Sequence, residues 1–193
     1  MAFTDNFNRS AEDLEASANW TRVDGSAGAA RVNASNQLRC VSEAAYQCPD
    51  QSSANHYTQA ALETEGDAFP IATRVTDKDN YIAARVRSTN VMELYKKASG
   101  SFSLLGSYGS GISAGDTLYL ESDSSDNHTV KHNGTTRIGP VSDAFNNTET
   151  RQGLIPRAAS YDPWIDDFEA GALGAPPAGA PPPGSLSLMG VGV

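Results

Sequence analysis

Short runs rich in Val, Ile, Leu and Tyr, separated by Asn, Asp, Gly and Ser, follow one another from Phe3 to Phe168. Runs of this length and punctuation are typical of β-strands joined by tight turns. The sequence lacks long stretches with the 3.6-residue periodicity of an amphipathic helix. The pattern predicts an all-β protein with antiparallel strands. The clearest strand candidates are residues 56–63, 71–77, 81–88, 91–98, 101–108 and 116–122.

Residues 71–87 are predicted to form a hairpin. The segment TDKDN at 76–80 supplies Asp and Asn at the turn, where their side chains bond the local backbone. The second strand alternates apolar side chains with a more polar set, which predicts one buried and one exposed face. The set expected inside is Ile82, Ala84 and Val86, and the set expected outside is Tyr81, Ala83, Arg85 and Arg87.

The segment HTVKHNGTTRI at 128–138 places two histidines four residues apart. It also contains Asn133-Gly134, the preferred pair for a two-residue type I′ turn, so it predicts a second hairpin. Four residues of a strand span about 13 Å at roughly 3.3 Å per residue. This is too far for one metal ion to bind both His128 and His132, and we expect no metal site.

Length and charge limit the possible functions. A chain of 193 residues can bury one good core. The net charge of -9 argues against nucleic acid, whose phosphates need a basic face. The start, MAFTDNFNRS, lacks the basic and apolar regions of a signal peptide, and the sequence lacks an apolar run long enough to cross a membrane. We therefore expect a protein made in a cytoplasm, without membrane, nucleic acid or cofactor as partner.

Two cysteines, Cys40 and Cys48, lie eight residues apart, a spacing that suits neither a zinc pair nor a redox CxxC motif. The favoured interpretation is two small buried residues that stay reduced. A hairpin disulfide remains the alternative.

The composition changes after Gly171. We predict a folded domain at 1–171, a spacer rich in Pro, Gly and Ala at 172–184, and an apolar arm at 185–193. The arm, SLSLMGVGV, has the two-residue alternation of a strand and is predicted to dock in a groove or on a sheet edge, its own or a neighbour's. Its docking residues are Leu186, Leu188, Met189, Val191 and Val193.

The segments FTDNFNRS (3–10), ANWTRVDG (18–25) and GLIPRAASYDPWIDDFEAG (153–171) resemble the opening and closing strands of concanavalin A-like, or laminin-G-like, jelly-roll domains. The resemblance covers residues 3–171. It implies an antiparallel β-sandwich with Trp20 in the core. If the first and last strands pair, three large apolar residues meet and close the sandwich. These residues are Phe3, Phe7 and Phe168.

The sequence lacks the motifs of the catalytic sites that such domains carry. Jelly-roll glycosidases need paired carboxylates on one strand face, as in E-x-D-x-x-E, and no such run is present. The densest acidic cluster, DDFE at 166–169, lies on the closing strand. The segment GSYGSG at 106–111 has the composition but not the G-x-S-x-G pattern of a nucleophile elbow, and SDSSDN at 122–127 favours a solvated turn over a loosely held calcium ion. We therefore predict that the protein is not an enzyme.

The candidate segment for glycan binding is SYDPW at 160–164. Jelly-roll lectins stack sugars on aromatic rings and hold hydroxyl groups with Asp, Asn and Arg. The candidates are Tyr161, Asp162 and Trp164. The favoured interpretation of Trp164, however, is that it packs beneath the final strand.

Two functions remain. The first is a non-enzymatic virion protein, because stand-alone domains with this DNFNR to IDDFEAG framing and a Pro/Gly-rich C-terminus resemble virion proteins of tailed bacteriophages. It would decorate the capsid or sit on head or tail, held by its arm to other virion proteins or to its own copies. The alternative is a carbohydrate-binding, lectin-like module for cell-surface glycans.

Overall fold

The computed structural model describes residues 1–63, 70–87, 90–109, 111–157 and 164–174. In these ranges the chain forms β-strands and one short 3-10 helix, and none of the helical structure there is long and apolar enough to cross a membrane. The predicted all-β class is confirmed.

All six strand candidates are found, two of them with the expected bounds. The elements are β1 (Phe3–Asp5), η1 (Leu14–Ala16), β2 (Thr21–Gly25), β3 (Ala30–Val32), β4 (Leu38–Cys40), β5 (Ala44–Gln47), β6 (His56–Leu62), β7 (Ile71–Asp77), β8 (Asn80–Val86), β9 (Val91–Ala98), β10 (Ser101–Gly109), β11 (Thr117–Ser122), β12 (Asn127–His132), β13 (Thr135–Ser142), β14 (Gly153–Leu154) and β15 (Trp164–Ala172).

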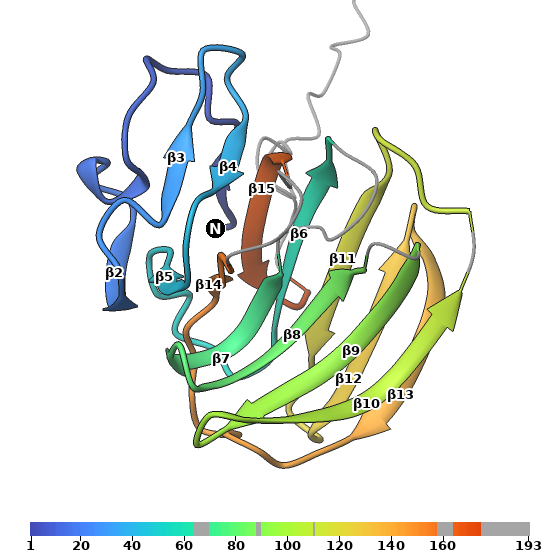
Figure 1. The fold of residues 1–193 in the computed structure, drawn as a ribbon. Helices are drawn as coiled ribbons and strands as arrows, with labels where there is room; N and C mark the ends of the chain where they lie inside the picture. Colours follow the sequence, from blue (N-terminus) through green and yellow to red (C-terminus); the bar gives the residue numbers. More distant parts are fainter. Residues whose placement is uncertain (64–69, 88–89, 110, 158–163, 175–193) are drawn as a thin grey trace, which may run out of the picture.

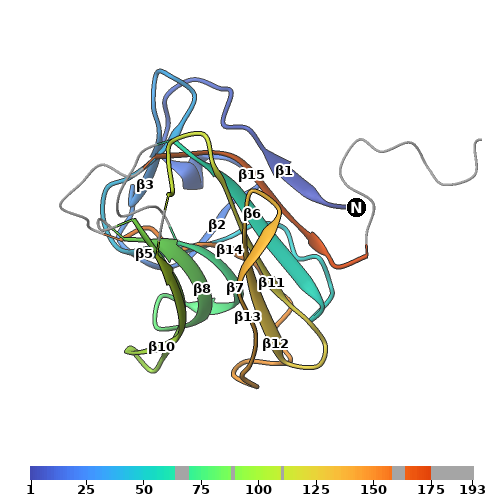
Figure 2. The same ribbon diagram turned by 90° about the vertical axis from the view of Figure 1, so that its right-hand side faces the viewer.

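The strands form two antiparallel sheets packed face to face (Figure 1). Within the described ranges, the eight-stranded sheet has the order β13-β12-β11-β6-β15-β4-β3, with β1 beside β15. The seven-stranded sheet has the order β10-β9-β8-β7-β14-β5-β2. Figure 2 shows the sheets as two layers. Leu120, Val130 and Leu94 belong to the core cluster that fills the space between them, so the predicted sandwich is confirmed.

The first and last strands close the sandwich. β1 pairs with β15, with Phe3 opposite Ala170 (Figure 2). The ring centroids of Trp20 lie 5.6 Å from those of Phe3 and 5.0 Å from those of Phe168. Phe7 is fully buried in the same core cluster. The expected closure by aromatic side chains is confirmed.

Both predicted hairpins are present. β7 pairs with β8, and the carboxylate of Asp77 accepts hydrogen bonds from the backbone of Asp79 and the side chain of Asn80. β12 and β13 are joined at Asn133 and Gly134, whose φ angles of 48° and 75° are those that a type I′ turn requires.

The expectation that β8 exposes its second face was wrong. Tyr81 and Ala83, expected outside, are both fully buried. They belong to a second apolar cluster, on the outer side of the seven-stranded sheet, which also contains Tyr95 and Ile155. Ile155, directly after β14, packs on this face, so strand alternation here places apolar clusters on both sides of the sheet.

Cys40 and Cys48 are buried as reduced thiols, which confirms the favoured interpretation. The Cys40 thiol lies 2.6 Å from the carbonyl oxygen of Arg157, and the Cys48 thiol lies 3.4 Å from that of Gln152. Burial raises the pKa of the Cys48 thiol, which keeps it protonated and unreactive.

Candidate functional site

The outer face of the eight-stranded sheet is open and polar. Alternation along β11 turns Leu118 and Leu120 into the core and leaves Tyr119 and Glu121 on the outside. The strand registers place outward side chains of neighbouring strands opposite one another. One such row crosses five strands over about 19 Å, at roughly 4.8 Å per strand. This polar row consists of Lys131, Tyr119, Gln59, Glu169 and Thr4.

Contacts within the sheet face hold the middle of the polar row in place. The rings of Tyr119 and Tyr57 stack with centroids 5.3 Å apart, and the ammonium of Lys131 lies 4.5 Å from the Tyr119 ring centre. The hydroxyl of Tyr57 donates to the Glu169 carboxylate, whose second oxygen accepts from Gln59 at 3.2 Å. Burial raises the pKa of Tyr57 and of Tyr119, so both phenols remain neutral.

A depression of about 450 Å³ lies at the Glu169 end of the polar row, where β1, β6 and β15 meet. Its exposed lining residues carry amide, hydroxyl or carboxylate groups. The carboxylate of Asp5 at its inner side accepts hydrogen bonds from the Trp20 indole at 2.7 Å and from the Phe7 backbone at 2.9 Å. The lining residues are Thr4, Asp5, Asn6, Asn19, Gln59, Asp167, Phe168 and Glu169.

A β-bulge in β15 places acidic groups at this depression. The register opposite β6 shifts between Asp166 and Glu169, and Asp167 has a φ of 47°. Ile165 and Phe168 are 0% and 1% exposed, so the two residues between them both lie on the outer side. Desolvation and the neighbouring Asp167 carboxylate raise the pKa of Asp166. The depression therefore suits ligands that donate hydrogen bonds rather than anions.

The predicted glycan residues are described only in part, since Tyr161 and Asp162 lie outside the described residues. Trp164 begins β15 opposite Arg39, whose guanidinium lies 5.6 Å from the indole ring centre. The indole is half-buried and lies on the same side of the sheet as Glu169, because Ile165 points into the core. Its contact with sugar stays a prediction. The arm residues Leu186, Leu188, Met189, Val191 and Val193 also lie outside the described residues.

Sequence reasoning did not single out the polar row. Only Tyr119 and Lys131 come from consecutive strands; the other members come from strands far apart in the chain, and the registers bring them together. A signal was present in the outward positions of two predicted strands, where aromatic and polar residues alternate with apolar ones. These positions are Tyr57 and Gln59 in HYTQAALE, and Tyr119 and Glu121 in DTLYLES.

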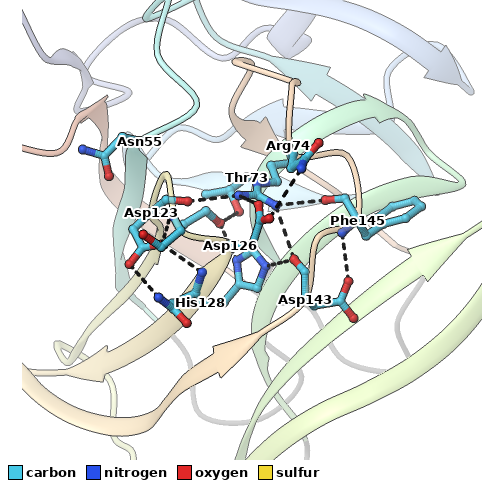
Figure 3. A network of polar contacts seen from close by, with 12 residues as sticks. Asn55, Thr73, Arg74, Asp123, Asp126, His128, Asp143 and Phe145 are labelled. Carbon is cyan, nitrogen blue, oxygen red and sulfur yellow. Dashed lines mark hydrogen bonds and ion pairs between the residues drawn. The ribbon is translucent and has the colours of Figure 1, made fainter.

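A buried arginine organises the polar interior at the other end of the sandwich (Figure 3). Arg74 is 0% exposed and has a φ of 53° where the pairing of β7 with β8 is irregular. Its guanidinium donates to the carbonyl oxygens of Phe145 and Asp123, each at 3.1 Å, and of Asp143 at 3.4 Å. It also pairs with the Asp126 carboxylate at 3.0 Å. One cation therefore ties two loops together.

The two histidines of the β12–β13 hairpin have separate partners. The ring of His128 is hydrogen-bonded to the Ser122 hydroxyl at 2.7 Å and to the Asp143 carbonyl at 2.9 Å (Figure 3). His132 instead lies 2.7 Å from the carboxylate of Asp116. Over the part of the chain that the structure describes, no three His, Cys, Asp or Glu residues are grouped to hold a metal ion.

The acidic segment 122–127 forms a turn. The Asp123 carboxylate accepts hydrogen bonds from the backbone of Ser125 at 2.8 Å and of Asn127 at 2.9 Å. Asp126 turns toward Arg74, which supplies the positive charge next to this loop. The favoured interpretation of the segment as a turn agrees with this geometry.

Stability is expected to fall as the pH drops from 7 to 4. His56 is fully buried; desolvation and the nearby charge of Arg74 lower its pKa from 6.5 to about 4, against the opposing effects of the Ser53 carbonyl and Glu149. The unfolded chain therefore takes up the proton first. Stabilisation by neutral His56 is complete above pH 6.5 and is lost toward pH 4, at about 1.4 kcal/mol per unit or about 3 kcal/mol in all.

Denaturant unfolding at several pH values measures this loss. Carboxylates titrate in the same pH range. The contribution of His56 is therefore the difference in unfolding free energy between the wild type and His56→Gln at each pH. We expect the variant to have a flatter dependence between pH 6.5 and 4. Equal slopes for the two proteins would contradict the role given to His56.

The similarity of this chain to known proteins lies in its fold. No protein-family model and no curated protein sequence matches the chain. Among solved structures, the carbohydrate-binding module CBM66 from Bacillus subtilis aligns with a TM-score of 0.56 and 15% identity, over 79% of this chain and 90% of the module. β-Agarase A from Zobellia galactanivorans aligns with a TM-score of 0.58 and 13% identity, over 86% of this chain and 88% of the agarase.

A third similar structure is a xylan β-1,4-xylosidase from Bacillus halodurans C-125, with a TM-score of 0.59 and 12% identity. The match covers 87% of this chain but only 38% of the xylosidase. The likeness establishes the fold. It is the β-sandwich found in carbohydrate-binding and glycosidase structures, in agreement with the concanavalin A-like resemblance.

Proposed function

We propose that the protein binds carbohydrate on the outer face of its eight-stranded sheet. The observation that carries this proposal is the polar row leading into the depression between β1, β6 and β15. The volume of this depression, about 450 Å³, lies in the range of ligand sites. The ligand would lie across the strands, with one unit in the depression and others along the row.

The chemistry of this face suits sugar hydroxyl groups. The amides of Asn6, Asn19 and Gln59 both donate and accept hydrogen bonds, and the carboxylates of Asp167 and Glu169 accept them. Tyr119, in the next strand, already stacks on Tyr57 and lies next to the Lys131 ammonium, so it would meet a sugar with the edge of its ring. Such a surface favours neutral sugars over sulfated or uronic ones.

The opposite outer face is less suitable. Over the central strands of the seven-stranded sheet, Tyr81 and Ala83 are fully buried and Tyr95 is only 2% exposed. A ligand there would have to displace an apolar cluster. The comparison with a carbohydrate-binding module supports the class of function, although it shows only the fold.

We propose binding without hydrolysis. A glycosidase needs one carboxyl group as acid and a second as base or nucleophile, about 5–10 Å apart, on either side of the scissile bond. Both oxygens of Glu169 already accept hydrogen bonds from Tyr57 and Gln59. Asp5 is likewise occupied by Trp20 and Arg9. Their engagement favours a structural and ligand-orienting role.

Attachment to a virion is a second, compatible proposal. The feature that favours it is the arm at 185–193, whose alternating apolar residues follow a spacer rich in proline. A displayed sandwich held by such an arm would bring the polar row to glycans on a cell surface. Many weak sites on one particle then give strong adhesion.

Binding is tested with the full-length protein on a glycan array, followed by calorimetry with the oligosaccharides that bind. Gln59→Ala combined with Asn19→Ala is expected to weaken binding about tenfold or more, because each change removes hydrogen bonds to the ligand. Trp164→Ala is expected to weaken it if the ligand reaches the start of β15. Arg87→Ala, on the other sheet, is the control.

Unchanged affinity in the double variant would contradict the proposed site, and the lack of any binding glycan would contradict the function. Release of new reducing ends during incubation would show that the protein hydrolyses its ligand, against the proposal of binding alone.

A further inference from the structure

Strand β10 is an edge strand whose first half lacks the usual protection. Among the described residues it pairs with β9 alone, so its other edge has no strand beside it. Exposed edges normally carry charges or proline, which prevent pairing with other chains. The sequence of β10, SFSLLGSYG, has neither. Phe102 and Leu104 are 46% and 60% exposed.

The regular part of this edge is its first half. The register with β9 is continuous from Ser101 to Leu104 and shifts before Gly106. Phe102 and Leu104 are two residues apart and therefore lie on the same face. The edge thus presents four residues of regular backbone with two exposed apolar side chains.

The arm repeats the sequence of this edge strand. Residues 101–106 read SFSLLG and residues 185–190 read SLSLMG. Four of the six positions are identical, and the other two exchange Phe for Leu and Leu for Met. A segment with the same alternation of serine and apolar side chains can occupy the same kind of position, with serines on one face and leucines on the other.

We infer that residues 185–193 of one copy add as a strand to the free edge of β10 in a second copy. Backbone hydrogen bonds along the edge would supply affinity, and the alternating side chains would set the register. Leu186 and Leu188 would extend the apolar strip formed by Phe102 and Leu104. Neither strand carries a charge that would repel the other.

Within one chain, the path from the end of β15 to the edge of β10 is long for the spacer that precedes the arm. β15 is four strands from β13, roughly 19 Å, and β10 lies beyond β13 in the other sheet, roughly 10 Å further. Figure 2 shows β10 and the end of β15 on opposite sides of the molecule. The ten residues 175–184 reach about 31 Å when fully extended as polyproline. The straight distances alone take up about 29 Å of this reach. A spacer that must also follow the surface would have to be fully stretched, whereas an arm from a second copy is under no such constraint, so we assign the arm to a second copy.

The mass of the full-length protein in solution tests the inference. Sedimentation equilibrium of the wild type is expected to show species above the monomer mass of 20.3 kDa, increasing with concentration. Leu104→Lys, and Leu186→Asp with Leu188→Asp, should each raise the dissociation constant at least tenfold. Val41→Lys is the control, because Val41 is similarly exposed, at 51%, on another part of the surface.

Charge complementarity distinguishes direct pairing from indirect effects. Mixing Leu104→Lys with the Leu186→Asp, Leu188→Asp variant should restore association, because the lysine edge then receives the acidic arm. Hydrogen exchange should show the β10 amides that point away from β9 protected in the wild type and unprotected in the arm variant.

Three results would overturn the inference. A wild type that stays monomeric would contradict the assignment of the arm to a second copy, even if β10 were protected by the arm of its own chain. Loss of association in the arm variant but not in Leu104→Lys would place the arm elsewhere. An equal effect of Val41→Lys would make the contact non-specific. None of these results bears on the carbohydrate proposal, which is measured on different residues.

Discussion

Replacing Arg74 by alanine is expected to lower the free energy of unfolding by about 3–5 kcal/mol, the loss typical of breaking a buried ion pair and its hydrogen bonds. The change removes the hydrogen bonds that the guanidinium donates to three carbonyl oxygens and its ion pair with the Asp126 carboxylate. It also leaves a cavity, because the whole Arg74 side chain is inaccessible to water. Denaturant titration at pH 7 measures the loss.

Two variants show whether the guanidinium itself is responsible. Arg74→Lys keeps the charge but cannot reach two loops with one planar group, so it should recover only part of the stability. Arg31→Ala removes an arginine whose side chain is 60% exposed and lies 3.7 Å from Asp13, and should change stability by less than about 0.5 kcal/mol. A lysine variant as stable as the wild type would show that charge alone suffices.

The inward position of Arg74 could not be predicted from the sequence. In IATRVTD, strand alternation places the arginine on one of the two sheet faces but does not predict which groups it contacts there. The irregular pairing of β7 with β8 and the φ of 53° at Arg74 reorient the side chain instead. The partners of the guanidinium belong to loops some 50 to 70 residues away in the chain. Local pattern carries no information on such a contact.

Features determined by local chemistry were predictable. The bounds of β7 and β9 agree with the expected strands, because their apolar residues alternate between clear turn signals. The turn at Asn133 and Gly134 follows from their tolerance of positive φ. The pairing of β1 with β15 followed from family resemblance and from the need to cover Phe3 and Phe168.

The candidate site needed the tertiary structure. Thr4 lies opposite Glu169, which lies opposite Gln59, and these neighbours are separated by more than 100 residues of chain. The bulge at Asp167 then turns two successive carboxylates outward. The sequence-based candidates came from one contiguous segment instead, of which only Trp164 is described. Trp164 lies on the same sheet face as the polar row. This shared face connects the sequence-based candidates with the site found in the structure.

Phe168→Ala is expected to lower the free energy of unfolding by about 3–5 kcal/mol, as large-to-small changes at buried aromatics do. Phe168 is 1% exposed, and its ring centroid lies 5.0 Å from that of Trp20 and 6.2 Å from that of Phe3. Its removal takes one aromatic contact from each of these rings and leaves only their contact with each other, at 5.6 Å. Phe102→Ala, at a site that is 46% exposed, should cost less than about 1 kcal/mol.

The same substitution should reach the candidate site, because Phe168 also lines the depression. β1 is held mainly by its pairing with β15 and by Phe3, so loss of the aromatic contact should free Thr4 and Asn6 from fixed positions. We expect faster hydrogen exchange in β1 and weaker glycan binding at temperatures where the variant is still folded. If β1 stays protected and binding is unchanged, then strand pairing alone holds the depression, and the aromatic cluster contributes to stability without shaping the site.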